Sequence, residues 1–496
     1  MGIVIRQSLK GIFVNYVGVL LGMFVQLYIV TKYFNNPEVY GLTKVIYEVS
    51  LLLGTLALLG SGSAGMRFFP YFRDEKSGNN GFLYYYTLFP MVGIVFFTIV
   101  YLVFRSPIEA YFGAKSALFN DYYYYVIPLM AVLALWSWGE NYANINMRIA
   151  IPKAVREVGM RLIMVCIYLA FGFGLLGVKG LIVSFICGYG VCMLTTLIYS
   201  LCIGSRELRH NWSFVSRDLR EKVVRYSGFL LLSTISGNLM SQLDIFMLAG
   251  VKGLYSAGVY AIVLYMAEVV NMPSRNISAI SAPLAAKAMK EGNMLEAESL
   301  YKQVSIHQML ASTVLLLIVY INLDNIFAII PNGHIYAEGK WAVLFLGFAK
   351  VIFGTLNFGN TLISFSRYYY WTLIVTIVLT FITIGTNLYF IPLYGLTGAA
   401  LATLIATVLS YSYQQYLVQV KLRTNPFTWR HLRVVVLLVA LFAINWLIPS
   451  FQGWSPWADC IIRTSIVCCV AVVLIYYLHI SEQINWFIAT KLLRRK

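Results

Sequence analysis

Residues Gly11–Gly41 read GIFVNYVGVLLGMFVQLYIVTKYFNNPEVYG, a long apolar run that ends in a short polar turn and a Tyr-Gly pair. A run of about 18 or more apolar residues predicts a helix that crosses a membrane. The same pattern returns at Gly228–Gly258, which reads GFLLLSTISGNLMSQLDIFMLAGVKGLYSAG. The two segments align without a gap at an offset of 217 residues, which indicates an internal duplication.

A second pair of segments gives nearly the same period. LLGVKGLIVSF around Gly180 aligns with FIPLYGLTGAA around Gly395 at an offset of 215 residues. Six predicted spans per repeat is an even number, so both halves enter the membrane with the same orientation. Parallel repeats are related by an axis along the membrane normal, and transporters of this kind bind substrate near the midplane at the interface of the repeats.

The composition is that of a membrane protein along the whole chain. Of 496 residues, 60% are hydrophobic and 11% are charged, whereas soluble domains are about 25% charged. Apolar runs predict roughly fourteen spans, at residues 11–32, 41–64, 82–104, 124–146, 158–176, 180–203, 227–250, 255–280, 306–330, 341–364, 369–390, 395–419, 433–449 and 462–480. No A-x-A-like cleavage site follows the first run, which is therefore expected to remain as a span.

These spans predict an all-α polytopic protein with two parallel six-helix lobes and two further helices. The predicted divisions are an N-terminal lobe (1–205), a basic cytoplasmic linker (206–226), a C-terminal lobe (227–420) and two C-terminal helices with a basic tail (421–496). With the N-terminus inside, 28 of the 37 Lys and Arg residues fall on the cytoplasmic side and 8 outside. This bias predicts that both termini are cytoplasmic. It also accounts for the net charge of +17 without a nucleic-acid partner.

Motifs of enzymes and metal sites are weak. Gly172, Gly174 and Gly177 match G-x-G-x-x-G, but a predicted membrane helix precedes them where the dinucleotide fingerprint needs a strand. The seven cysteines lie nearly all in apolar runs without a C-x-x-C pair, as expected of small helix-packing residues. We therefore expect no catalytic residue, no cofactor and no metal.

Several charged residues fall inside predicted spans, where a charge near the bilayer centre costs about 2.5–3.5 kcal/mol on insertion scales. Lys350 lies about nine residues, or about 14 Å, into its span. Glu48, Asp244 and Glu268 are also within spans. One interpretation is structural, with Glu268 paired to Lys350; the other is that the set lines a polar cavity.

Asparagines and an arginine extend this set towards the predicted cytoplasmic side. In WGENYANINMR, Glu140, Asn144 and Arg148 are spaced i, i+4 and i+8, which predicts one helical stripe at the inner end of the fourth span. Asn357 lies near the inner end of the tenth.

The segment GSGSAG at residues 60–65 precedes Arg67, and the second half carries Arg275 within NMPSRNISAISAPLAAK. Small residues let helices approach closely or bend. Each half is therefore predicted to carry a flexible inner half-helix with an arginine at its cytoplasmic mouth. Two arginines would suit a diphosphate, because guanidinium groups match phosphate oxygens in a bidentate way. The alternative is that both are ordinary positive-inside anchors.

Three segments carry a resemblance to a known family. EVYGLTKVIYEVSLLLGTLALLGSGSAGMRFFP and SAGVYAIVLYMAEVVNMPSRNISAISAPLAAKAMKEGN resemble the corresponding regions of bacterial polysaccharide-unit (O-antigen, Wzx-type) flippases, and NLYFIPLYGLTGAALATLIA resembles their twelfth-span motif. These flippases belong to the multidrug/oligosaccharidyl-lipid/polysaccharide (MOP) exporter superfamily. The resemblance reaches to about residue 420. Fourteen spans resemble the lipid II flippase branch, whose two extra helices form a groove for the lipid tail, whereas twelve spans are commoner among O-unit flippases.

The resemblance implies a V-shaped two-lobe fold and alternating access in the bacterial cytoplasmic membrane. The implied substrate is an undecaprenyl-diphosphate-linked oligosaccharide for polysaccharide or lipopolysaccharide biosynthesis, and the implied partners are membrane lipids, a polymerase and glycosyltransferases. The basic residues Arg67, Arg275, Lys350 and Arg148 would hold the diphosphate, in a cavity that Asn144 and Asn357 also line. Glu48, Asp244 and Glu268 would balance charge or bind a coupling cation, with H+, Na+ and membrane potential left open as driving forces.

Two alternatives stay open. The first is a cation-coupled drug antiporter of the same superfamily, in which acidic cavity residues are usually needed to attract cations. The basic excess near the predicted cavity mouth argues against it. The second is a membrane glycosyltransferase or polysaccharide polymerase. The longest predicted exterior loops run to only about twenty residues, too short for the catalytic loop that such enzymes usually carry.

Overall fold

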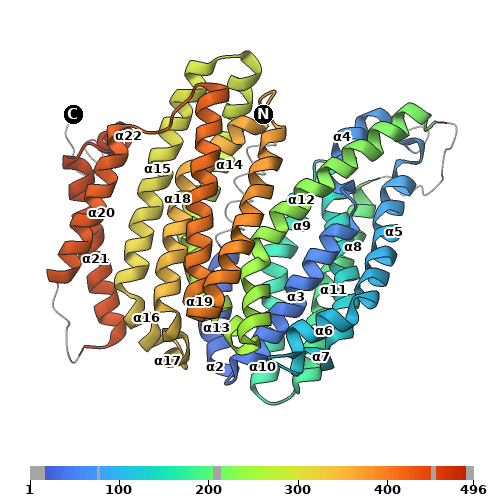
Figure 1. Cartoon of the computed structure of the whole chain (residues 1–496), viewed down its shortest axis with the longest axis horizontal. Helices are drawn as coiled ribbons and strands as arrows, with labels where there is room; N and C mark the ends of the chain where they lie inside the picture. Colours follow the sequence, from blue (N-terminus) through green and yellow to red (C-terminus); the bar gives the residue numbers. More distant parts are fainter. Residues whose placement is uncertain (1–16, 75–78, 205–213, 448–453, 488–496) are drawn as a thin grey trace. The chain divides into compact units, whose positions relative to one another are not determined.

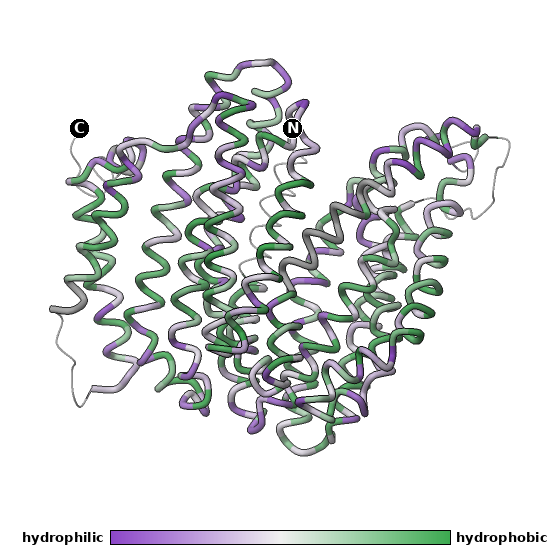
Figure 2. The backbone as a smooth tube through the Cα atoms, viewed as in Figure 1, coloured by the Kyte–Doolittle hydropathy of each residue, from purple (hydrophilic) through white to green (hydrophobic). Residues whose placement is uncertain are grey.

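A computed structural model describes residues 17–74, 79–204, 214–447 and 454–487, and every regular element in these ranges is a helix (Figure 1). The chain divides into two compact units, Met1–Gly258 and Val259–Lys496. Within each unit, hydrophobic residues run along the middle of the helices and hydrophilic residues gather at the ends (Figure 2). The fold is therefore an all-α polytopic membrane fold, and its helices fit about fourteen spans.

The first unit is built around α3 and α8. Its helices are Val17–Tyr33, which includes the π-helical turn η1 (Val25–Val30) and α2 (Thr31–Tyr33), α3 (Pro37–Ala57), α4 (Ser61–Phe72), α5 (Phe82–Val103), α6 (Arg105–Gly113), α7 (Leu118–Asp121), α8 (Val126–Ile145), α9 (Ala150–Ala154), η4 (Val155–Gly159), α10 (Met160–Gly172), α11 (Val178–Ile203), α12 (Arg217–Lys252) and the start of α13 (Leu254–Glu268). Helix α3 packs on α8, α5 and α12, and α8 also packs on α11.

The predicted second span, 41–64, is interrupted. Helix α3 ends at Ala57, and Leu59 and Gly60 adopt left-handed backbone angles, with φ of 50° and 73°. The small residues that follow open a new helix, α4, instead of finishing the old one. As predicted, these small residues allow close packing. A Cβ on Gly62 would lie 2.7 Å from Asn141 Nδ2, and one on Gly65 would lie 2.6 Å from Tyr86 Cε2.

The second unit holds the remaining helices. They are the end of α13, η5 (Val269–Asn271), α14 (Met272–Glu291), α15 (Met294–Ile321), α16 (Leu323–Ile329), α17 (Gly333–Tyr336), η6 (Ala337–Gly339), α18 (Lys340–Ser364), α19 (Tyr370–Leu422), α20 (Trp429–Leu447), α21 (Pro456–Tyr477) and α22 (Glu482–Phe487). Helices α15, α18 and α19 pack side by side, and α14 packs on both α15 and α18. As in the first unit, a helix break precedes an arginine-bearing helix, here the 3₁₀ turn η5 before α14.

Three predicted spans differ in detail from the helices. The predicted span 306–330 covers only part of a longer helical run, α15 (Met294–Ile321) followed by α16 (Leu323–Ile329). Its first turns are polar, and Asn293 caps them by accepting a 3.2 Å hydrogen bond from the Glu296 N–H, so hydropathy alone missed them. Spans 369–390 and 395–419 are both within α19, which folds back at Gly395 (φ 56°, ψ −125°). Across this turn the Thr386 hydroxyl donates to the Ala402 carbonyl oxygen at 3.4 Å.

The two C-terminal helices, α20 and α21, contact the rest of the second unit along their length and at both ends. Their apolar faces pack on α15, in a cluster of Ile306, Leu310, Leu317, Val434, Leu437, Leu441, Val467, Ala471, Ile475 and Ile480. At one end, His431 Nε2 lies 3.0 Å from the Ser305 hydroxyl, which donates to the Thr355 carbonyl oxygen at 2.8 Å. At the other end, Asn325 donates to Asp459 Oδ2 at 2.6 Å.

The duplicated segments meet in a reciprocal contact within the first unit. Gly41 of α3 and Gly258 of α13 are equivalent residues in the aligned repeat, and so are Pro37 and Leu254. A Cβ on Gly41 would overlap the Leu254 carbonyl oxygen, and a Cβ on Gly258 would overlap the Pro37 carbonyl oxygen. Each Cβ would also lie 3.0 Å from the backbone nitrogen of the other glycine. This exchange of contacts between residues that are equivalent in the alignment supports the duplication.

We expect Gly41→Ala and Gly258→Ala to destabilise the protein by similar amounts, of about 1–3 kcal/mol each, because either methyl group forces two backbones apart. The double variant should lose less than the sum, since one separation relieves both overlaps. The measurement is the thermal unfolding midpoint of the purified chain in detergent. Gly190→Ala, where a Cβ would meet no atom within 4 Å, is the matched control and should be neutral or slightly stabilising. Unequal effects at Gly41 and Gly258 would contradict the symmetry.

Candidate functional site

A charged cluster occupies the second unit where α13 ends. Glu268 is the last residue of α13, and the Lys350 ammonium of α18 lies 2.6 Å from its Oε2. The Arg275 guanidinium of α14 pairs with the other carboxylate oxygen, Glu268 Oε1. Asn271 donates to the same oxygen at 3.0 Å. Three elements thus converge on one carboxylate, and the turn η5 is what brings Arg275 back towards Glu268.

The cluster carries a net positive charge, because two cations share one anion. The Glu268 and Lys350 side chains are 27% and 26% exposed, whereas Arg275 is 60% exposed. The predicted pairing of Glu268 with Lys350 is therefore present. This pair does not neutralise the whole cluster, because Arg275 is also present. Its guanidinium is largely exposed, and its remaining N–H groups can bind an anion.

The helix that carries Arg275 is held by polar contacts directly beside it. Ser274 and Ser312 of α15 share a hydrogen bond of 3.3 Å. The Gln308 amide donates to the Ser274 carbonyl oxygen at 3.1 Å and to the Ser278 hydroxyl at 2.8 Å. Buried amide and hydroxyl contacts of this type join helices in membranes. They fix α14 against α15 at the residue before Arg275.

Helix α18 extends the polar surface beyond the cluster. Asn357 lies seven residues after Lys350, which is about two helical turns, so both are on one face of α18. Asn357 is half-buried. The structure thus brings together Glu268, Arg275 and Lys350. Asn357 lies on the same helix as Lys350, α18, and on the same face.

In the first unit, Arg67 is exposed on α4. Its guanidinium carbon lies 4.2 Å from the centroid of the Tyr226 ring of α12. Stacking of this kind orients a guanidinium through its face and leaves its N–H edge available to an acceptor. Tyr226 was not expected from the sequence, because stacking partners far apart in the chain leave no local pattern.

The predicted stripe of Glu140, Asn144 and Arg148 is wrong at its last member. Helix α8 ends at Ile145, Met147 has a φ of 58°, and the Arg148 N–H donates to the Ala143 carbonyl oxygen at 2.9 Å in the closing turn. Arg148 therefore leaves the helical face, although it is exposed. Asn144 stays in the last turn of α8, half-buried.

Glu140 is paired with an arginine outside the stripe. Arg156 binds it with both ends of the guanidinium, Nη2 to Oε2 at 2.6 Å and Nε to Oε1 at 2.7 Å. The same guanidinium lies 4.9 Å from the Trp136 ring centroid. No sequence pattern pairs Arg156 with Glu140, because the π-helical turn η4 that positions Arg156 has no simple sequence signal.

Two further predicted acidic residues lie on α3 and α12. Glu48 is half-buried on α3, one turn from Lys44, and Asp244 is buried at 8% exposure on α12. Among the described residues, no group of three or more His, Cys, Asp or Glu side chains is placed to hold a metal ion.

Solved structures that share this fold include a flippase and MATE family transporters. A lipid II flippase, MurJ, in an inward closed conformation matches with a TM-score of 0.70 and 13% identity, over 95% of this chain and 99% of its own. An inward-facing multidrug resistance MATE family transporter of the MOP superfamily matches with a TM-score of 0.63 and 15% identity, over 81% and 95%. The MATE transporter VcmN of Vibrio cholerae matches at 0.56 and 14%, over 85% and 98%. The chain has their fold. No family model and no curated protein matches the sequence.

The MurJ and MATE structures match different fractions of this chain. The two MATE structures are covered almost completely, yet they leave 15–19% of this chain unmatched, while MurJ leaves 5%. Residues 421–496, which contain α20, α21 and α22, are about 15% of the chain. The extra length of this protein relative to the MATE fold is thus the size of its C-terminal segment.

We expect Lys350→Met and Glu268→Gln each to lower the thermal unfolding midpoint, because the first removes one of the two cations that balance Glu268 and the second leaves Lys350 and Arg275 without their anion. The double variant should lose less than the sum of the two. Fully buried pairs cost about 3–5 kcal/mol to break, and this pair should cost less because both side chains are a quarter exposed. Lys340→Met, on the same helix but paired with the 79% exposed Asp324, is the control and should have little effect. Strictly additive losses would show that Lys350 and Glu268 are not coupled.

Proposed function

We propose that the protein is a flippase that moves a lipid-linked oligosaccharide, joined to its lipid by a diphosphate, from the inner to the outer leaflet of the bacterial cytoplasmic membrane. The observation that carries this proposal is the charged cluster of the second unit. A membrane-embedded carboxylate is shared there by two cations, and one of them, Arg275, remains largely open. A fixed positive excess inside a membrane unit favours an anionic group of the substrate over a cationic one.

Arg275 is suited to a phosphate group by its chemistry and by its support. Guanidinium binds phosphate oxygens through two parallel N–H bonds, and Glu268 and the neighbouring Ser274 contacts hold the side chain and its helix in place. Arg67, stacked on Tyr226, offers a second oriented guanidinium in the first unit. Lys350, Arg148, Asn144 and Asn357 are proposed as further substrate contacts, and Glu48, Asp244 and Glu268 as charge-balancing or ion-coupling residues.

The fold supports alternating access. MATE family transporters of this fold have been solved in both inward-facing and outward-facing conformations, and MurJ in an inward closed one. MurJ is matched over 95% of this chain and the MATE transporters over 81–85%, and this longer match supports a lipid-linked substrate. We further propose that both termini are cytoplasmic, and that α20 and α21 form a groove for the lipid tail. We propose that H+, Na+ or membrane potential drives the transport, and that glycosyltransferases and a polysaccharide polymerase act before and after it.

A drug/cation antiporter is the second candidate, because MATE transporters share the fold. Such an exporter needs a carboxylate that is free to attract a cation. Glu268 is engaged by two cations, which makes it unsuitable in this conformation. An enzyme acting on lipid-linked sugars is the third, and the MurJ and MATE structures that share the fold give it no support.

The test is made in a deletion strain of the source bacterium complemented with variants. We expect the strain without the protein to accumulate complete lipid-linked units on the cytoplasmic leaflet. Arg275→Gln and Arg67→Gln should fail to restore export at normal protein levels, whereas Arg220→Gln, an exposed cation on α12, should restore it. The readout is the leaflet distribution of extracted lipid-linked glycans.

Other outcomes separate the alternatives. Incomplete units, or complete units that reach the outside and stay unpolymerised, would indicate an enzyme. An unchanged lipid-linked pool with new drug sensitivity would indicate an antiporter. Normal export by both arginine variants would refute the role of Arg67 and Arg275 in binding the diphosphate. The flippase proposal itself would still be tested by the leaflet distribution of lipid-linked units in the deletion strain.

A further inference from the structure

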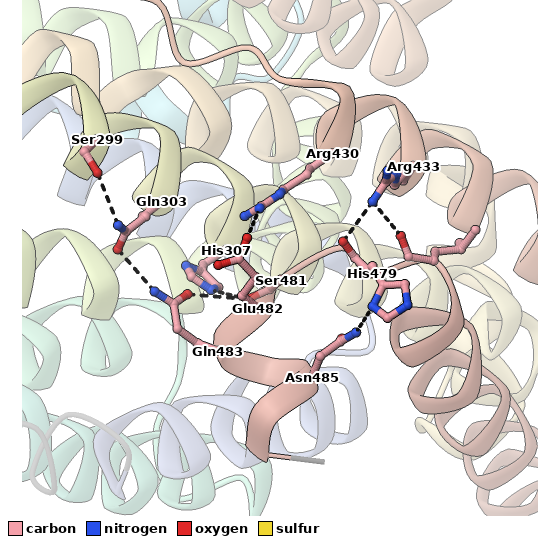
Figure 3. A network of polar contacts seen from close by, with 11 residues as sticks. Ser299, Gln303, His307, Arg430, Arg433, His479, Ser481, Glu482, Gln483 and Asn485 are labelled. Atoms are coloured by element: carbon pink, nitrogen blue, oxygen red, sulfur yellow. Dashed lines mark hydrogen bonds and ion pairs between the residues drawn. The ribbon is translucent and has the colours of Figure 1, made fainter. Parts of the chain in front are cut away.

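A polar pocket in the second unit lies outside the charged cluster and is not used by the proposed transport site. It has a volume of about 380 Å³, within the range of small-molecule sites. Its walls come from the first turns of α15, the start of α20 and the start of α22 (Figure 3). The lining residues are Ser299, Lys302, Gln303, Ile306, His307, Thr428, Arg430, Ser481, Glu482 and Gln483.

The pocket wall is a connected and preformed structure. Ser481 and His307 Nε2 lie 2.9 Å apart, and Gln483 donates to Gln303 Oε1 at 3.3 Å. The turn that precedes Ser481 is fixed by Arg433, which donates to the carbonyl oxygens of Leu478 and His479 at 3.0 Å each (Figure 3). The lining side chains therefore hold one another, and Arg433, outside the pocket, holds the turn that leads into them, as a preformed binding site requires.

Its chemistry is that of an anion site. Hydrogen-bond donors dominate the wall, from hydroxyl groups and side-chain amides, and two cations, Lys302 and Arg430, join them. Arg430 is 40% exposed, and its ion-pair partner is Glu482, a residue of the short helix α22 that is itself 82% exposed. The Glu482 carboxylate thus occupies the position of an anionic ligand on the guanidinium. An exposed ion pair of this kind contributes little, so a better anion can replace the carboxylate.

We propose that this pocket binds the phosphate group of an anionic phospholipid, which displaces Glu482 from Arg430. The pocket lies where α20 begins and α21 ends, at the level at which two membrane helices meet the headgroup region. The adjoining segment 421–433 carries four cations, which attract anionic lipid. The site does not depend on the transported substrate, and it would tie the C-terminal helices to the lipid composition of the membrane.

The probe is phosphatidylglycerol, titrated onto the purified full-length chain and counted by native mass spectrometry, with phosphatidylcholine as the zwitterionic comparison. We expect one phosphatidylglycerol to bind in preference to phosphatidylcholine. Arg430→Gln should weaken this binding by about tenfold, because it removes the bidentate donor. Glu482→Gln should strengthen it by up to about fivefold, because it removes the internal competitor.

The opposite signs of these two variants are the decisive feature. Arg423→Gln removes a neighbouring exposed cation that does not line the pocket, and it should bind as the unaltered chain does. Equal losses in Arg430→Gln and Arg423→Gln would show only general attraction to a basic surface. Weaker binding by Glu482→Gln, a change at an exposed side chain, would overturn the displacement model even if Arg430→Gln failed to fold. Release of the lipid by millimolar inorganic phosphate would assign the site to a soluble anion and overturn the lipid proposal.

Discussion

Inside a membrane the hydrophobic effect contributes little to the packing of one helix on another, because lipid tails are as apolar as the side chains. Helix association therefore depends on how closely the backbones approach and on the polar groups that come into contact. The contact of Gly41 with Leu254 and of Gly258 with Pro37 is the clearest case in this protein. It places the backbone of α3 directly on the start of α13, at equivalent residues of two repeats. A side chain at either glycine is incompatible with it, and this explains why the duplicated pattern ends in glycine both times.

Polar groups are the second half of the same constraint, because a group that is taken out of water must find a partner. Tyr301 shows this in the second unit, where its hydroxyl lies 3.2 Å from the Leu356 carbonyl oxygen and 2.7 Å from Gln415 Oε1, joining α15, α18 and α19. The charged cluster obeys the same rule with a different outcome. Glu268 satisfies two cations at once, so the requirement for pairing is met while a net positive charge is retained.

Features that depend on composition and period were predictable from the sequence. The spans, the duplication, the use of small residues for close packing and the pairing of Glu268 with Lys350 all follow from residue type and spacing. Features that depend on where a helix stops were not. Arg148 was placed on a stripe because i, i+4, i+8 spacing holds only while the helix continues, and α8 closes at Ile145 with no proline or glycine to announce it. The start of α15 was missed for the converse reason, since its polar first turns project beyond the hydrophobic run that defined the span.

The partners that tertiary structure supplies were equally hidden. Arg156 reaches Glu140 through a π-helical turn, and Tyr226 reaches Arg67 from a helix more than 150 residues later in the chain.

The exposure of the paired carboxylate distinguishes the roles proposed for Arg275 and Arg430. A guanidinium held by a partly buried carboxylate and a packed helix, as at Arg275, is oriented before a ligand arrives. One held by an exposed carboxylate on a short helix, as at Arg430, can exchange that partner for another anion. Exposure of the counter-charge, 27% at Glu268 and 82% at Glu482, is therefore what distinguishes a fixed positive site from an exchangeable one.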